Sequence, residues 1–183
     1  MRIASRLIAE RGFNAVSMVQ IGDAAGISGA AVYRHFTNKQ DLLAQIVIPP
    51  AAHILHGARK AIADIEDPRE VLETLVAFHT VRITRAIAAM QVYFRCADSL
   101  TERDRDRLDD IADSYYDLWV EPVLQLRPDM DRPAALLAVH AVLRIFAITP
   151  DERRSMTDGA RGRLTATLAR GALDALTAKP QNP

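Results

Sequence analysis

Residues Ser17–Phe36, with the sequence SMVQIGDAAGISGAAVYRHF, constrain the fold more than any other stretch of the chain. Ser17 can accept a hydrogen bond from a free backbone N–H of a first helical turn, and Gln20 stands where it completes a capping box. Gly26 is suited to end that helix in a left-handed conformation. Because Ser28 is a second N-cap, the stretch predicts two short helices joined by a tight turn.

The apolar residues of this stretch predict how the two helices pack. Met18 and Ile21 repeat at helical spacing in the first helix, and they give it one narrow apolar face. Val32 and Phe36 lie four residues apart in the second helix. We expect Ile27 to anchor the turn in the core. Small residues on the first helix should let the second helix cross it closely, namely Gly22, Ala24 and Ala25.

Composition indicates a folded, helical protein. The chain has 183 residues, of which 49% are hydrophobic, and this supports a sizeable core and excludes a disordered chain. Ala and Leu dominate, and no Asn-Gly or Asp-Gly pair stands between alternating apolar residues as it would in a hairpin. We therefore expect an all-α fold.

Charge and cysteine content exclude several classes of protein. The 23 Lys and Arg residues balance the 23 Asp and Glu residues, so the whole chain is not a basic nucleic-acid binder. The single cysteine, Cys96, excludes an internal disulfide and a metal site made of cysteines. The sequence shows no metal-ligand spacing and no catalytic motif, so we expect no metal, no cofactor and no enzyme activity. Without a signal peptide or a long apolar run, we expect a cytoplasmic protein that does not enter a membrane.

The pattern of breaks predicts two domains. Residues Arg2–Arg11 read as a helix that Gly12 ends, and they open a head of residues 1–48. Pro49 and Pro50 predict a kink or a helix boundary near Ile48, because proline cannot donate a backbone hydrogen bond. A helical body of residues 49–178 follows, and residues 179–183 form a loose tail.

The body contains several helical patterns. One pattern starts at Asp67, runs to about Ala97 and is long enough to leave open a break near Thr84. Ala134–Ile148 is apolar nearly all round, so we expect burial on two sides of that helix. A last helix is predicted over Arg153–Ala178, with small residues that permit close packing.

Residues Ala9–Leu43, AERGFNAVSMVQIGDAAGISGAAVYRHFTNKQDLL, strongly resemble the DNA-binding head of the TetR family of transcriptional regulators. The resemblance implies about nine α-helices, with a three-helix helix-turn-helix head and a larger body for ligand binding and dimerisation. It also implies a homodimer, a palindromic operator in double-stranded DNA and a small-molecule effector. Two body segments, VYFRCADSLTERDRDRLDDIADSYYDLWV and AVHAVLRIFAITP, resemble actinobacterial-type members, some of which sense acyl-CoA or other lipid-derived ligands.

The resemblance also assigns DNA contacts. Ser17 and Lys39 match phosphate-contacting positions of the family. The turn and the recognition helix are matched by Ser28, Gly29, Ala30, Ala31, Tyr33, Arg34 and His35. Gly29 stands where a polar residue is common, and Gly22 replaces the usual alanine. The small residues leave direct readout to the three side chains from Tyr33 onward, so we expect part of the operator to be read through DNA shape.

Polar and aromatic residues on or beside the apolar stripes of the body are candidates for an effector pocket. They are His79, Arg82, Tyr93, Arg95, Tyr115, Trp119, His140 and Arg144. Some of them could meet an anionic group of a ligand. The alternative is structural: the cations snorkel or pair with acids, and the aromatic residues belong to the core.

The sequence as a whole predicts a ligand-responsive, sequence-specific regulator of transcription. We expect a repressor that a small apolar or acyl-type ligand releases from its operator, and a homodimer that pairs through the last two helices. The first alternative is a helical architectural or protein-interaction module with weak, non-specific DNA binding. The second is a helical enzyme that uses His79 or His140, for which no catalytic motif is present.

Overall fold

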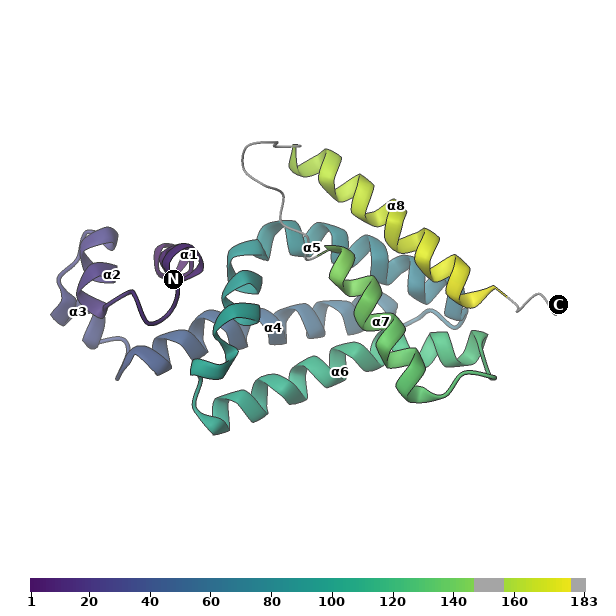
Figure 1. Ribbon diagram of the computed structural model, residues 1–183, viewed down its shortest axis with the longest axis horizontal. Coiled ribbons are helices and arrows are strands. Elements are labelled where there is room, and N and C mark those ends of the chain that lie inside the picture. The colour runs from purple at the N-terminus through teal and green to yellow at the C-terminus, as the bar shows by residue number, and fades with distance from the viewer. Residues whose placement is uncertain (147–156, 179–183) are drawn as a thin grey trace. The chain divides into compact units, whose positions relative to one another are not determined.

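The computed structural model describes residues 1–146 and 157–178, without the side chains of residues 82–91, 93, 94 and 158. Every regular element in these ranges is helical, so the predicted all-α fold is confirmed (Figure 1). The elements are α1 (Arg2–Arg11), α2 (Met18–Ala25), α3 (Gly29–Tyr33), α4 (Lys39–Ile62), α5 (Pro68–Cys96), the 3-10 helix η1 (Ala97–Ser99), α6 (Glu102–Leu126), α7 (Arg132–Phe146) and α8 (Asp158–Thr177).

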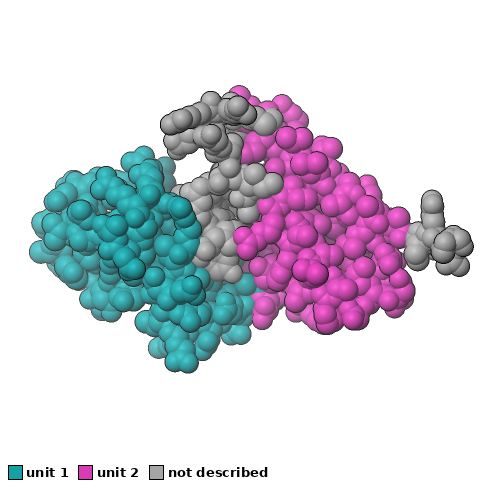
Figure 2. Space-filling view, viewed as in Figure 1, with its two compact units in different colours: residues 1–53, 86–112 teal, residues 54–85, 113–183 magenta. Residues whose placement is uncertain are grey.

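The chain divides into two compact units (Figure 2). Unit 1 contains residues 1–53 and 86–112, and unit 2 contains residues 54–85 and 113–183. The helices α4, α5 and α6 therefore each contribute residues to both units. The domain boundaries predicted from the sequence, 1–48, 49–178 and 179–183, stay a prediction.

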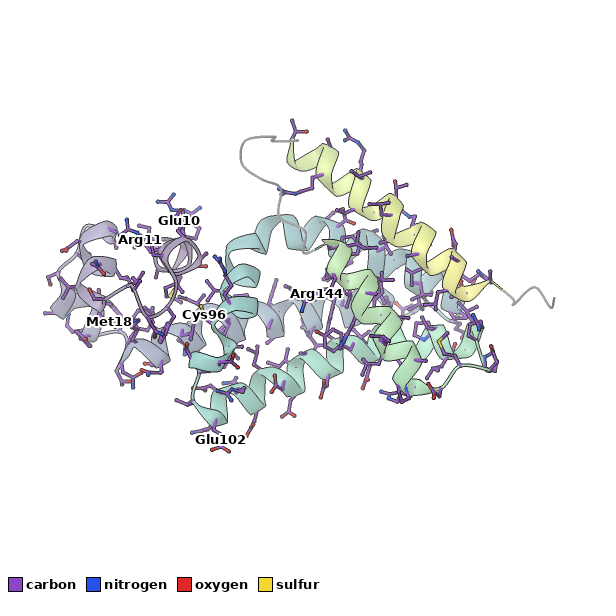
Figure 3. All side chains as sticks on the ribbon, in the orientation of Figure 1. Glu10, Arg11, Met18, Cys96, Glu102 and Arg144 are labelled. Carbon is purple, nitrogen blue, oxygen red and sulfur yellow. The ribbon has the colours of Figure 1, made fainter. Side chains whose placement is uncertain are left out.

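The core of unit 1 combines the head with a second segment of the chain. Ile8, Val16 and Leu43 are fully buried in it. The end of α5, η1 and the start of α6 add Val92, Cys96, Leu100 and Leu108 to the same core. Figure 3 labels Met18 and Cys96, which come from these two parts. A chain of about fifty residues buries only a modest share of its surface by itself, and the second segment adds to the core of the head.

A polar contact also ties these two parts of unit 1 together. The guanidinium of Arg95, near the end of α5, donates a hydrogen bond to the backbone carbonyl of Ala9 at 2.8 Å. Ala9 lies in the last turn of α1, where carbonyls lack partners within the helix. A cation at the C-terminal end of a helix is also favoured by the helix dipole.

The two adjacent prolines do not end a helix. The helix α4 runs from Lys39 to Ile62 through Pro49 and Pro50, so the helix boundary predicted near Ile48 is wrong, and the alternative of a kink there stays a prediction. Apolar side chains are buried on both sides of the prolines, and this packing along the helix outweighs the lost backbone hydrogen bonds. The helix α5 likewise continues through Thr84 without the break that its length left open.

Unit 2 packs α7 and α8 against each other and encloses its own core. Leu75, Trp119 and Val139 are fully buried there. The small residue Gly162 lets α8 approach α5, since a Cβ atom at this position would lie 3.2 Å from Cγ2 of Thr80. This observation confirms close packing by a glycine of the last helix.

One face of α7 and one face of α8 remain open in the single chain. Leu137 is 72% exposed, and Leu164 and Leu168 are 48% and 50% exposed. Burial of Ala134–Ile148 on two sides is therefore absent within one chain, and Ile148 itself lies outside the described residues. The start of the last helix predicted at Arg153 also lies outside them. Among the described residues, no helix is both long and apolar enough to cross a membrane.

Candidate functional site

The first helix of the candidate DNA-binding unit starts with a complete capping box. The backbone N–H of Gln20 donates to Oγ of Ser17 at 3.2 Å, and the backbone N–H of Ser17 donates to Oε1 of Gln20 at 2.8 Å. The helix ends at Gly26, whose φ of 71° is left-handed. Both end signals predicted from the sequence are confirmed, and they fix α2 without help from distant residues.

The second helix is a single short segment with its polar residues outside. Oγ of Ser28 accepts a hydrogen bond from the backbone N–H of Ala31 at 3.1 Å, as the predicted N-cap requires. Val32 is buried, whereas Tyr33 is 55% exposed. Arg34 and His35 follow in the turn after α3 and are exposed as well. The three side chains expected to read DNA are thus held at the surface by a buried neighbour.

The two helices cross at glycines. A Cβ atom on Gly22 would lie 2.8 Å from the carbonyl oxygen of Ile27, and one on Gly29 would lie 3.1 Å from Cγ2 of Val19. The predicted close approach at Gly22 is confirmed, while Ala24 and Ala25 are exposed and do not contribute to it.

The prediction that Ile27 anchors the turn in the core is wrong. Its side chain is 44% exposed. The backbone of the turn makes the contact instead, because the N–H of Ile27 donates to the carbonyl of Gly22 at 2.9 Å. Without a side chain at Gly22, the turn is fixed by backbone contact and needs no apolar anchor.

The start of α4 is also capped as predicted. Oδ1 of Asn38 accepts a hydrogen bond from the backbone N–H of Asp41 at 2.8 Å, and the carboxylate of Asp41 accepts one from the backbone N–H of Thr37 at 2.9 Å. Lys39 is the first residue of this helix and is half-buried. Its ammonium lies 4.3 Å from the centroid of the Phe13 ring, and burial lowers the pKa of this ammonium.

Unit 2 gathers three of the candidate effector residues in one buried cluster. Nδ1 of His79 and the hydroxyl of Tyr115 share a hydrogen bond of 2.6 Å. The rings of Trp119 and Phe146 also contact His79, with centroids 5.9 Å and 4.6 Å away. Among the described residues, the indole N–H of Trp119 has no hydrogen-bond acceptor.

Burial sets the charge of this cluster. It lowers the pKa of His79 from 6.5 to about 3, so the imidazole is neutral at pH 7. Burial also raises the pKa of Tyr115, so the phenol stays protonated. The cluster therefore offers aromatic surface and neutral hydrogen-bonding groups, and it carries no charge with which to meet an anion.

The other candidates whose side chains are described lie outside this cluster. His140 is exposed on α7 and its ring contacts Tyr116, with centroids 4.3 Å apart. Arg144, labelled in Figure 3, is exposed on the same helix. Arg95 belongs to unit 1. The side chains of two further candidates lie outside the described residues, namely Arg82 and Tyr93. Among the described residues, no group of His, Cys, Asp and Glu side chains could hold a metal ion.

Comparison with known families identifies the head. Residues 1–46 match the family described as bacterial regulatory proteins, tetR family. This domain belongs to the TetR family. The match includes both N-caps, the two crossing glycines and Lys39, so the geometry described above is that of a TetR-family head.

Curated relatives extend the similarity beyond the head. The HTH-type transcriptional repressor KstR2 of Rhodococcus jostii is 29% identical over 119 residues, or 64% of this chain. The matched region is 58% of that protein, so this chain spans less than two thirds of its relative's length.

Solved structures of bacterial regulators have a similar fold over most of the chain. The ketosteroid transcriptional regulator KstR2 of Mycobacterium tuberculosis is 19% identical, with a TM-score of 0.83 over 97% of this chain and 93% of that chain. AibR, solved in complex with isovaleryl coenzyme A and operator DNA, is 22% identical, with a TM-score of 0.68 over 91% of this chain and 93% of that chain. At these identities the comparison establishes the all-α fold alone.

Two aromatic residues outside the predicted sites contact residues of those sites in the structure. Phe146 lies seven residues after Val139 on the buried face of α7, which is the signal of a core residue and does not reveal its contact with His79. Phe13 follows the glycine that ends α1, and the sequence indicates a packing role for it. Its contact with Lys39 appears only in the folded head.

Proposed function

We propose that this chain is a homodimeric, ligand-responsive regulator of transcription that binds DNA in a sequence-specific manner, and that it acts as a repressor. The observation that carries the proposal is the doubly capped α2–α3 unit within a TetR-family head, with Val32 buried and Tyr33, Arg34 and His35 exposed. A helix-turn-helix places such an exposed face in the major groove.

The residues of the head divide into two roles. Ser17, at the start of α2, and Lys39, at the start of α4, contact phosphates, where free backbone N–H groups and an ammonium both favour an anion. Ser28 and the small residues Gly29, Ala30 and Ala31 bring the backbone of α3 close to the bases. Direct readout falls to the guanidinium of Arg34, the phenol of Tyr33 and the imidazole of His35.

Dimerisation doubles this short reading surface. We assign one face of α7 and one face of α8 to pairing with a second copy of the chain. These faces carry the exposed leucines Leu137, Leu164 and Leu168. Gly171 continues the α8 face, and a Cβ atom there would meet open space within the chain. Two heads would then bind two half-sites of a palindrome, about one helical turn apart.

The buried cluster of unit 2 is the proposed place of the effector. Its aromatic rings and neutral His79 suit an apolar or acyl-type ligand, and an acceptor on that ligand would satisfy the indole N–H of Trp119. The AibR complex with isovaleryl coenzyme A supports this ligand class. Because α4 contributes to both units, a ligand that favours one position of α4 would shift the affinity for DNA.

This proposal assigns the chain a role at DNA in the cytoplasm, without an enzymatic step, a cofactor or a metal. The similarity to a transcriptional repressor supports regulation over catalysis. One observation favours the architectural alternative: Gly29, Ala30 and Ala31 bring few side-chain donors to the reading face. In that case DNA binding would be weak, sensitive to salt and insensitive to sequence.

Selection of bound duplexes from a random pool tests the proposal. We expect one palindromic site to be enriched, and we expect Tyr33→Ala and Arg34→Ala each to weaken binding to it at least tenfold. Arg69→Ala, which removes an exposed charge on α5, is the matched control and should bind as the wild type does. Enrichment of no common site would favour the architectural module.

Light scattering tests the dimer. We expect the wild type to be dimeric and Leu168→Asp to be monomeric, because a carboxylate would be buried in the interface. Gln125→Asp introduces the same charge at an exposed position of α6 and should remain dimeric. A monomeric wild type would contradict the dimer.

Fluorescence of Trp119 tests the effector site, since this residue is the single tryptophan of the chain. We expect isovaleryl coenzyme A, or another short acyl-CoA, to change its emission, and coenzyme A alone to change it much less. Native mass spectrometry of the purified protein would identify a ligand that co-purifies. A ligand that binds without altering Trp119 emission would place the effector elsewhere.

A further inference from the structure

Lys39 and Phe13 form a contact that no helix-capping rule requires. The ammonium nitrogen of Lys39 lies 4.3 Å from the centroid of the Phe13 ring. This distance is well within the range at which the negative face of an aromatic ring attracts a cation. The contact lies within unit 1 and joins the α1–α2 connection to the first residue of α4.

Packing in the core of unit 1 fixes the ring of Phe13 independently of its contact with Lys39. Gly12 ends α1 with a φ of 86°, a conformation that favours glycine, and the chain then turns Phe13 into the core of unit 1. Phe13 is buried, and it also lines a surface groove with Asn38 and Gln40, the residues on either side of Lys39. The ring is therefore a rigid platform at the start of α4.

Lys39 places a positive charge at the N-terminal end of α4, where the helix dipole disfavours it. The N-terminal end of a helix carries partial positive charge and disfavours a cation. Asn38 and Asp41 already cap the backbone N–H groups there, so Lys39 adds nothing to the cap. The ring of Phe13 offsets this cost, and an ammonium held in place at a helix start is well placed to bind an anion.

We propose that Phe13 is a positioning residue for DNA binding, because its ring holds the Lys39 ammonium in place to contact a backbone phosphate. This inference rests on the proposed function. A free lysine side chain loses rotamer freedom when it binds, whereas one held against a ring has already lost much of it. Partial burial, which lowers the pKa of Lys39, has also removed part of the water that binding would displace.

The test measures binding to a fluorescent 30-base-pair duplex of random sequence over a range of salt concentrations. Such binding depends on phosphate contacts and needs no known operator. We expect Lys39→Gln to flatten the dependence of log K on log salt by about one unit for each lysine lost. Phe13→Leu should weaken binding by about 5- to 25-fold in a dimer and should flatten the same slope. Phe13→Tyr, which keeps the ring, should restore both.

Two comparisons separate positioning from folding. A merely structural role of Phe13 would lower the melting temperature and leave the salt slope unchanged. If Phe13 acts through Lys39, its loss has no further effect once Lys39 is replaced. The double variant Phe13→Leu/Lys39→Gln should then bind DNA no more weakly than Lys39→Gln alone. If Phe13→Leu does not fold, Phe13→Met removes the ring with less change in volume.

NMR of the wild type gives a readout without DNA. The ring current of Phe13 should shift the ε-CH₂ protons of Lys39 upfield, and ordinary shifts would overturn the inference. A wild type that binds the duplex while Phe13→Leu keeps the same affinity and slope would also overturn it, and would leave the proposed function intact. A wild type that binds neither this duplex nor any selected site would overturn the proposed function, and this inference with it.

Discussion

The α2–α3 unit of the head and the His79 cluster of unit 2 are built in opposite ways. The head unit is held by hydrogen bonds that span three residues, and it carries its polar side chains outward. The cluster joins His79 to Tyr115, 36 positions away, and buries its polar groups. An exposed polar surface can be specified locally, whereas a neutral buried cluster requires several helices to pack around it.

The two regions also differ in what their aromatic residues do. Tyr33 is exposed beside a buried valine, and its side chain is free to meet a partner. Trp119 is fully buried and contacts His79 and Tyr115. Substitution should therefore affect binding at the first position and stability at the second.

The largest effect expected on stability is at Trp119. Trp119→Ala leaves a cavity in the core of unit 2 and should lower the free energy of unfolding by about 3–5 kcal/mol. Tyr33→Ala should lower it by less than about 0.5 kcal/mol, because its side chain is mostly exposed. Urea unfolding of both variants measures the difference. Similar losses at the two positions would contradict the contrast between the regions.

A smaller effect follows from the charge of His79. The pKa of His79 is about 3 in the folded protein and 6.5 when unperturbed. Between these two pH values the imidazole binds a proton in the unfolded chain but stays neutral in the folded protein. The contribution of His79 to the free energy of unfolding is fully present above pH 6.5 and is lost as the pH falls towards 3. The loss is about 2 kcal/mol at pH 5.

Urea unfolding of the wild type at pH 7.5 and pH 5 measures this loss. His79→Gln keeps a polar side chain and does not titrate in this range, so it should lose about 2 kcal/mol less than the wild type over the same interval. Equal losses in the two proteins would show that His79 is accessible to protons in the folded state.

The crossing of α2 and α3 gives a third test. Gly22→Ala places a Cβ atom 2.8 Å from a backbone oxygen that cannot rotate away, and should cost about 1–3 kcal/mol. Gly159→Ala is the matched control, because its Cβ atom would have ordinary contact with Arg163. Because Gly159 lies in the first turn of α8, this control should change the free energy of unfolding by less than about 1 kcal/mol. A neutral Gly22→Ala would show that the turn can open.

The smallest effect is expected at the N-cap of α2. Ser17→Ala removes the acceptor of the capping box and should cost about 1 kcal/mol, while Ser17→Thr keeps the hydroxyl and should cost much less. Thermal unfolding followed by circular dichroism measures both. Equal melting temperatures for these two variants would show that α2 is held by packing alone.

Features that depend on neighbouring residues are predictable from this sequence, whereas those that depend on distant residues are not. The caps at Ser17, Ser28 and Asn38 were predicted because each depends on residues within three positions. The anchor at Ile27 was predicted wrongly, because the close approach of backbone to Gly22 replaced it. The boundary near Ile48 failed for a similar reason, since buried side chains on both sides carry α4 through the prolines.

The sequence by itself determined the helix-turn-helix, the all-α fold and the residues that face outward on α3. Helix caps, left-handed glycines and helical spacing depend only on residues that are close in the sequence, so a short stretch is enough to predict them. Tertiary structure alone decided that residues 86–112 complete the core of the head, that Phe13 lies under Lys39, and that His79 meets Phe146. Such contacts depend on which buried surfaces pack together, and a helical pattern shows which face is buried without naming its neighbour.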